Sequence, residues 1–200
     1  YEIASCLVGS EMCIRDSVTA VLNGKSFDTS MGFTPLDGLV MGTRAGSMDV
    51  SAATYIAEKE GMSYKELDTM LNKKSGVQGV SGVSSDMREI CAAVDEGHPR
   101  ATLALNMYEY RIRKYIGSYA AAMGGVDVIL FTGGVGENQD NTREAACRGL
   151  EFMGVKIDTE KNKTVRGEEA IISTPDSKVK VVVIPTDEEL MIATDTMNLL

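Results

Sequence analysis

Short apolar runs along the chain predict the strands. Residues 18–22 and 26–29 are strand-like and flank Asn23-Gly24, the dipeptide that most strongly indicates a tight β-hairpin. Residues 126–131 and 179–184 are rich in β-branched and aromatic side chains, which favours two buried strands. A hairpin and two buried strands are therefore the expected framework of a sheet.

Helical spacing of apolar residues predicts the remaining regular structure. A stripe recurs every three to four residues through 99–123, which indicates a long helix with one buried face. Ser63 with Glu66 forms a capping-box pattern ahead of a second helix, and Ser85 or Asp86 begins a third. Helix 99–123, the strand after it and the following helix make a crossover unit, so the sheet is expected to be parallel or mixed.

Three stretches lack such periodicity and are expected to be loops. Residues 31–49 are glycine-, proline- and small-residue-rich but still carry apolar side chains, which favours a functional loop over disorder. Residues 76–85 and 158–172 are interpreted as further loops. Residues 1–17 lack the regular pattern of apolar and polar residues that begins at position 18.

Composition narrows the functional classes. The 200 residues carry a net charge of −9, a balance opposite to that of a general nucleic-acid binder. No apolar run approaches the roughly 18 residues that span a bilayer, and no signal peptide is evident. The four cysteines form no metal-binding spacing, so reduced thiols in a cytoplasmic protein are expected. A first residue other than Met suggests a fragment.

The segment 132–138 is the strongest candidate for chemistry. It follows a predicted strand, contains three glycines and precedes Ala145 and Ala146, which with Leu150 and Met153 have helical spacing. A strand–glycine turn–helix unit can present bare backbone amides to a phosphate. About half of such turns are merely tight connections. The pattern matches neither the dinucleotide fingerprint nor a Walker A loop.

Single charged residues leave more than one interpretation. Arg44 lies among small residues that leave its guanidinium uncrowded, although a surface arginine paired with an acid is the commoner case. Glu188 begins the last predicted helix, where an acid can simply favour the helix dipole. His98, the only histidine, is interpreted as a linker or cap residue ahead of Pro99.

Four motifs together resemble the acetate kinase family of the acetate and sugar kinase/actin-like superfamily. They are DTSMGFTPLDGLVMGTR at 28–44, SDMR at 85–88, FTGGVGEN at 131–138 and IPTDEE at 184–189, in the family's order and spacing. The resemblance runs from about residue 18 to the end. It implies an α/β fold, an actin-like ATPase (ribonuclease H-like) domain with a mixed sheet flanked by helices.

The resemblance also implies roles for individual residues. Arg44 would contact the carboxyl or acyl phosphate and stabilise the transferring phosphoryl group, and Glu188 would hold Mg²⁺ directly or through water. The nucleotide ATP would be bound from two sides. The residues implied for that binding are Asp86, Met87, Arg88, Gly134, Val135, Gly136, Glu137 and Asn138.

The implied reaction is reversible phosphoryl transfer from ATP to acetate, giving acetyl phosphate and ADP, in a cytoplasmic homodimer without nucleic-acid or membrane partners. The family's His-Leu-Gly-Asn-Gly turn is missing, so residues 1–17 are interpreted as foreign sequence and 18–200 as the C-terminal nucleotide-binding domain. With the N-terminal half absent, this chain alone is expected to have little activity. A non-catalytic actin-like nucleotide-binding module, or a propionate or butyrate kinase, remains an alternative.

Overall fold

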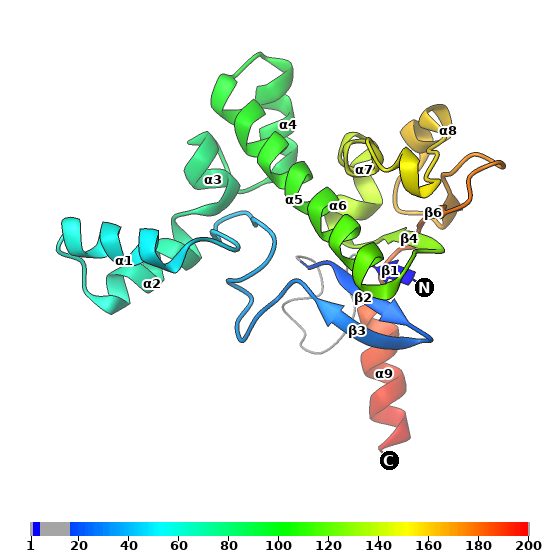
Figure 1. Cartoon of the computed structure of the whole chain (residues 1–200), viewed down its shortest axis with the longest axis horizontal. Coiled ribbons are helices and arrows are strands. Elements are labelled where there is room, and N and C mark those ends of the chain that lie inside the picture. The colour runs from blue at the N-terminus through cyan, green and yellow to red at the C-terminus, as the bar shows by residue number, and fades with distance from the viewer. Residues whose placement is uncertain (1, 5–16, 200) are drawn as a thin grey trace.

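The computed structural model describes residues 2–4 and 17–199, without the side chains of residues 2–4, Glu188 and Met191. Within this part, a mixed sheet lies at one end and a pair of helices, α1 and α2, projects from the other (Figure 1). The long helix α5 runs from the sheet to α3 and α4. Cys6, Cys13 and most of the segment 1–17 lie outside the described residues.

The described strands form one six-stranded sheet in the order β3-β2-β1-β4-β6-β5. Neighbours β1–β4 and β4–β6 are parallel, whereas β1–β2, β2–β3 and β5–β6 are antiparallel. The strands are β1 Glu2–Ala4, β2 Thr19–Leu22, β3 Lys25–Thr29, β4 Val128–Phe131, β5 Ala170–Ile171 and β6 Lys180–Val183. The expected mixed sheet is confirmed.

The hairpin β2–β3 forms where the sequence predicts it. Asn23 and Gly24 both have positive φ, 53° and 71°, as a type I′ turn requires. Gly24 has open space where a Cβ would lie, so conformation and not crowding favours glycine there.

The helices are arranged around α5, which lies against β1 and β2 and against α3, α4 and α7. Their bounds are α1 Val50–Lys59, α2 Tyr64–Lys73, α3 Gly76–Ser81, α4 Met87–Asp95, α5 Pro99–Met123, α6 Gly133–Asn138, α7 Asp140–Cys147, α8 Thr159–Thr164 and α9 Glu188–Asn198, with a 3-10 turn at Glu151–Met153. His98 caps α5 by accepting from the Ala101 amide at 3.2 Å, as its cap interpretation requires.

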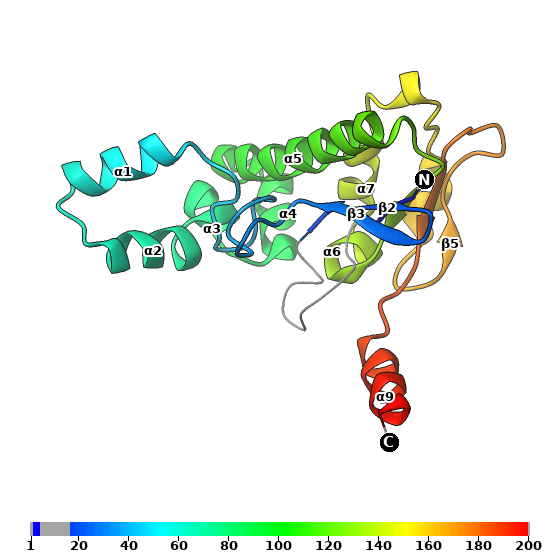
Figure 2. The same ribbon diagram turned by 60° about the horizontal axis from the view of Figure 1, so that its bottom comes forward.

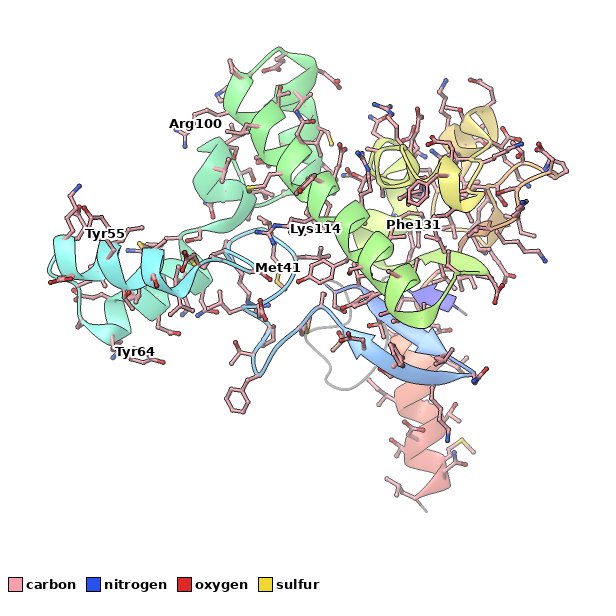
Figure 3. The ribbon with its side chains drawn as sticks, viewed as in Figure 1. Met41, Tyr55, Tyr64, Arg100, Lys114 and Phe131 are labelled. Carbon is pink, nitrogen blue, oxygen red and sulfur yellow. The ribbon has the colours of Figure 1, made fainter. Side chains whose placement is uncertain are left out.

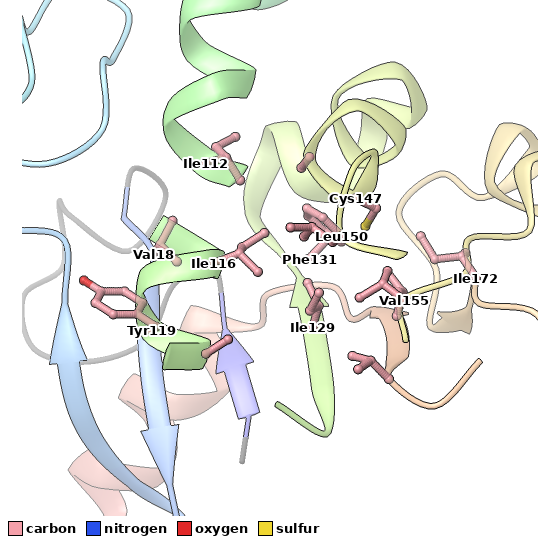
Figure 4. Packing of buried hydrophobic residues seen from close by; sticks show 14 of the residues in the cluster. Val18, Ile112, Ile116, Tyr119, Ile129, Phe131, Cys147, Leu150, Val155 and Ile172 are labelled. Atoms are coloured by element: carbon pink, nitrogen blue, oxygen red, sulfur yellow. The ribbon is translucent and has the colours of Figure 1, made fainter. Parts of the chain in front are cut away.

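Two apolar clusters hold these elements together. In the larger one, the buried face of α5, which includes Ile116 and Tyr119, packs on a sheet that contributes Ile129 and Phe131 (Figure 4). The smaller cluster joins α3 and α4 to the first half of α5 through side chains such as Ile90. Burial of these stripes fixes α5 against the sheet and against α3 and α4.

Three sequence predictions of local structure are wrong. Residues 76–81 form helix α3, because Val77 is buried against α4 and α5 in the smaller cluster. Residues 158–172 contain α8 and β5, which pack on α7 and β6. The helix predicted through Leu150 and Met153 ends at Cys147, just before Gly149, whose φ is 83°. Tertiary contacts outweighed local sequence in the first two cases, whereas the third helix ends beside a glycine in the left-handed conformation.

Helix α9 extends away from the sheet in both views (Figures 1 and 2). All its residues with described side chains are exposed, including Leu190 and Ile192. Among the described residues, no helix combines the length and apolar character needed to cross a bilayer.

Candidate functional site

A pocket of about 660 Å³ opens where loop 31–49, the start of α4 and the exposed face of α6 meet. That volume is typical of a small-molecule site. Apolar side chains and backbone form much of the lining, together with six side chains that can hydrogen-bond or carry charge. The lining residues are Met41, Gly42, Val77, Ser85, Asp86, Met87, Arg88, Tyr108, Gly134, Val135, Asn138 and Gln139.

The start of α4 forms one wall of the pocket. Asp86 is the N-cap, and its Oδ1 accepts from the Arg88 amide at 2.8 Å. The Arg88 guanidinium also donates to both carboxylate oxygens of Asp86. These hydrogen bonds from Arg88 lower the pKa of Asp86 to about 2. The wall therefore presents an ionised carboxylate and an exposed guanidinium side by side.

Helix α6 forms the facing wall. It starts one residue after β4, at Gly133, whose φ is 72°. A Cβ at Gly136 would lie 3.3 Å from the Phe131 carbonyl carbon, so glycine lets this helix sit close on the strand. Gly134 has nothing within 4 Å of the position of a Cβ, which leaves its backbone open to the pocket. The predicted glycine turn is thus a short helix whose pocket side combines the open backbone of Gly134 with Val135 and Asn138.

Glu137 belongs to α6 but does not line the pocket. Its Oε1 accepts from the Gly133 amide at 2.8 Å and from the amide and hydroxyl of Thr186, each at 2.9 Å. The Thr186 hydroxyl also accepts from the Gly133 amide at 3.0 Å. This network joins the start of α6 to the segment that leads into α9. Glu188 follows two residues later, and its side chain lies outside the described residues.

Loop 31–49 is fixed at its pocket end by backbone hydrogen bonds. The Met41 carbonyl accepts from the Val77 amide at 2.9 Å, and the Thr43 carbonyl accepts from the Ser75 amide at 2.9 Å. A Cβ at Gly42 would lie 2.9 Å from the Ser85 carbonyl oxygen, so glycine permits this approach. Met41 lies near the middle of the molecule, well away from Tyr55 and Tyr64 on the α1–α2 hairpin (Figure 3).

Arg44 lies two residues beyond the pocket-lining Gly42 and is partly buried. Its backbone carbonyl accepts from the Met41 amide at 3.1 Å, and its Nη1 lies 3.5 Å from the Met41 sulfur. None of the ion pairs among the described residues includes Arg44. The guanidinium is therefore not tied to an acid in this part of the chain, unlike the commoner surface arginine.

A preformed metal cage is absent from the described residues, since no group of three or more His, Cys, Asp or Glu side chains gathers to hold an ion. Asp187 is occupied as the cap of α9, accepting from the Leu190 amide at 3.0 Å. Mg²⁺ commonly uses only one or two carboxylates together with phosphates and water. A single acid such as Glu188 fits that type of site.

The structure brings most of the candidate residues to one place. Six of them line the pocket: Asp86, Met87, Arg88, Gly134, Val135 and Asn138. Gly136 and Glu137 belong to α6 but do not line the pocket. Arg44 follows Met41 and Gly42, the residues of loop 31–49 that form the pocket floor. Val77 had been placed in a loop, and Tyr108 resembled an ordinary core position of a long helix. The lining residues that were not predicted as site residues are Met41, Gly42, Val77, Ser85, Tyr108 and Gln139.

Comparison of the sequence with known proteins shows which family this chain is related to. Residues 5–194 match the acetokinase family. The chain belongs to the acetokinase family. It is 65% identical over 199 residues to the acetate kinase of Phocaeicola vulgatus, covering 100% of this chain and 49% of that protein. The chain thus spans about half the length of the curated relatives it matches.

Solved structures of the family share its fold. The crystal structure of Porphyromonas gingivalis acetate kinase superposes with a TM-score of 0.92 at 53% identity, covering 98% of this chain and 48% of that one. A propionate kinase from Francisella tularensis gives 0.89 at 42% identity, covering 100% and 49%. The expected fold, an α/β domain of the actin-like ATPase class, is confirmed.

Proposed function

We propose that this acetokinase-family chain is the nucleotide-binding, C-terminal half of a kinase that transfers the γ-phosphoryl group of ATP to acetate, giving acetyl phosphate and ADP reversibly. The observation that carries this proposal is the pocket in which the start of α4 faces the pocket side of α6. Family membership supports the reaction class.

In this proposal the two walls hold the nucleotide from opposite sides. Asp86, Met87 and Arg88 contact the adenosine from α4, while the segment from Gly134 to Asn138 contacts it from α6. The size of the pocket suits a nucleoside, and the open backbone at Gly134 supports close approach of the ligand. Gly136 and Glu137 serve this binding by shaping α6.

Arg44 is the proposed catalytic residue. A planar guanidinium can donate two parallel hydrogen bonds to phosphoryl or carboxylate oxygens, and it remains charged throughout transfer. Its lack of an acidic partner among the described residues leaves it available for that contact. Glu188 would hold Mg²⁺, which when bound neutralises charge on the phosphates. Such transfer depends mainly on positioning and electrostatics.

Two alternatives are tested with this proposal. The likeness to a propionate kinase favours a longer acyl substrate as the second candidate. A nucleotide-binding module without phosphotransfer is the third. We also propose that residues 18–200 belong to the C-terminal nucleotide-binding domain of this kinase, and that the intact protein is a cytoplasmic homodimer.

The decisive experiment uses the full reading frame that contains this chain. Acyl phosphate formed from ATP and acetate, propionate or butyrate is trapped with hydroxylamine and measured. We expect acetate to react fastest, and Arg44→Ala to reduce acyl phosphate formation by about 10³-fold without weakening ADP binding. Arg148→Ala, at an exposed arginine that follows the last residue of α7, is the matched control. Equal activity of Arg44→Ala and Arg148→Ala would remove Arg44 from the mechanism.

The chain of residues 1–200 is assayed beside it. We expect ADP binding with little acyl phosphate formation, because the pocket is present whereas half the length of the relatives is not. Turnover by this chain comparable to that of the full protein would contradict the proposed incompleteness. Absence of ADP binding by the full protein would contradict the nucleotide site itself.

A further inference from the structure

Arg143, in α7 behind α6, is a buried arginine whose hydrogen bonds are all made to backbone or amide oxygens. Its side chain is fully buried, with 0% of its surface exposed. Nε donates to Asn162 Oδ1 at 2.7 Å, and Nη2 donates to the carbonyls of Asn162 at 2.9 Å and Val165 at 3.0 Å. Nη1 donates to the carbonyls of Gly136 and Glu137 in α6. All five N–H groups of the guanidinium are therefore satisfied.

The two acceptors on α6 lie on its back. Nη1 donates to the carbonyls of Gly136 and Glu137, both at 2.9 Å. Gly134, Val135 and Asn138, on the same helix, line the pocket, whereas Gly136 and Glu137 do not. Arg143 thus holds the rear of the wall whose front faces the proposed nucleotide.

The guanidinium also occupies the carbonyl ends of two short helices. Gly136 and Glu137 lie in the last turn of α6, Asn162 lies in the last turn of α8, and Val165 is its C-cap. Carbonyls at a helix C-terminus lack intrahelical partners and carry partial negative charge, which a cation satisfies. Asn162 in turn donates from Nδ2 to the Asp140 carbonyl at 2.9 Å, which joins α8 to the start of α7.

Burying this cation is costly, so a purely packing role is a poor explanation. Desolvation lowers the pKa of Arg143 to about 10, with the nearby Arg166 contributing. Among the described ion pairs, none includes Arg143. Apolar residues of similar volume are often at least as stabilising as a buried charge. A planar donor that fixes carbonyls in three directions, however, has no apolar equivalent.

We propose that Arg143 is a positioning residue for nucleotide binding: it fixes α6 from behind so that the pocket wall is preformed. This rests on the proposed function for the identity of the ligand. The arrangement of α6 itself is independent of it. Because a displacement of about 1 Å in a positioned group can cost up to 10²-fold, loss of this clamp is expected to weaken the nucleotide site selectively.

The test compares Arg143→Lys and Arg143→Ala with the control Arg148→Ala, all made in the protein encoded by the full reading frame. ADP is titrated calorimetrically. We expect the dissociation constant to rise by about tenfold or more in both Arg143 variants and to stay unchanged in the control. Added guanidinium, below denaturing concentrations, is expected to restore part of the affinity of Arg143→Ala but not of Arg143→Lys, whose side chain still fills the site.

Affinity and stoichiometry separate positioning from simple misfolding. A structural defect lowers the fraction of protein that binds, whereas a misplaced wall raises the dissociation constant of the protein that does bind. Unchanged affinity with reduced stoichiometry would overturn the positioning role while leaving the proposed function intact. Failure of the parent protein to bind ADP would instead overturn the proposed function.

Hydrogen exchange gives a readout that needs no ligand. In Arg143→Lys the amides of 133–138 are expected to exchange faster than in Arg148→Ala, with little change in α4, the opposite wall. Exchange that rises equally in both walls, or in neither, would contradict the clamp. This measurement also decides the question if Arg143→Ala does not accumulate as folded protein.

Discussion

The two walls of the pocket face each other, yet contacts of different range hold them in place. At the start of α4, Asp86 and Arg88 are two residues apart and bond to one another at an exposed position. In α6, the supporting partners are Thr186, which is 49 residues from Glu137, and Asn162, which is 19 residues from Arg143. The first wall is locally encoded, whereas the second exists only after distant segments meet.

This difference predicts different sensitivity to substitution. Exposed pairs contribute little free energy because water and salt screen them. The α6 contacts range from exposed at Thr186 to partly buried at Gly133 and buried at Asn162. Hydrogen bonds that are at least partly buried contribute more, since removal of one partner leaves the other desolvated and unpaired. Substitutions in long-range contacts should therefore change stability more than substitutions at the α4 wall.

The largest effect is expected at Gly76, which supports the pocket floor. Its φ is +67°, and a Cβ there would lie 2.3 Å from the Met41 carbonyl oxygen. Gly76→Ala should lower the free energy of unfolding by about 3 kcal/mol, measured by urea denaturation. Gly61→Ala is the matched control, with φ +63° but open space around it, and should cost about 1 kcal/mol. Equal losses would show that the close contact with Met41 has no energetic weight.

A smaller loss is expected at Glu137, the long-range contact of the α6 wall. Glu137→Ala removes the shared acceptor of the Gly133 and Thr186 amides and should lower unfolding free energy by about 2 kcal/mol. Glu137→Gln keeps an acceptor oxygen and should lose roughly half as much. The comparison is made by thermal and urea unfolding. If alanine and glutamine variants are equally stable, the carboxylate does not hold the two segments together.

Glu109, a partly buried acid on α5 near Cys91 of α4, provides a test by pH. Burial raises its pKa from 4.5 to about 7, although Arg148 and Arg113 act in the opposite direction. The folded state therefore binds more protons than the unfolded state between these values. Stability associated with Glu109 is fully present below pH 4.5 and is lost as the pH rises through about 7.

Glu109→Gln removes this titration. Discounted for partial exposure, the parent should lose about 1 kcal/mol more than the variant between about pH 4.5 and pH 8. Urea denaturation across this range measures the difference, with exposed Glu96→Gln as the control. Parallel stability profiles of parent and Glu109→Gln would contradict the raised pKa.

The smallest effect is expected at the α4 wall. Arg88→Ala should leave the urea midpoint unchanged, because the Arg88 side chain is 85% exposed. The pKa of Asp86 should nevertheless rise from about 2 toward its ordinary value, since its largest perturbing hydrogen bond is lost. Carboxyl NMR titration detects this change. A clear loss of stability in Arg88→Ala would mean that the side-chain contacts of the α4 wall stabilise the fold as much as those of the α6 wall.

Local chemistry made several elements predictable. Asn23-Gly24 produced the hairpin turn, and Ser63 with Glu66 formed the predicted reciprocal cap, with the Ser63 amide 2.8 Å from Glu66 Oε2. Asp86, one of two candidate caps, is the N-cap of α4, and His98, interpreted as a linker or cap residue, is the N-cap of α5. In each case the residues that decide the conformation are neighbours in the chain, so the sequence contains the relevant interaction directly.

Other features had no local signal. Val77 belongs to a glycine- and serine-rich stretch and becomes helical because it is buried beside α4 and α5. Arg111 and Arg113 lie on α5 and donate to the carbonyls of Ser47 and Ala145, contacts that the apolar stripe of this helix does not predict. A helical pattern shows which residues share a face, but it does not show which neighbouring segment covers that face.

The sequence by itself determined the turns, caps and buried strands, the acidic surface and the four motifs that pointed to the family. Only the tertiary structure decided that Glu137 bonds to Thr186, that Arg143 lies behind α6, and that loop 31–49 forms the floor between two walls. The physical reason is the separation in sequence of the residues that interact. Neighbouring residues interact before the chain has folded, whereas a pocket and its supports depend on which distant surfaces become buried together.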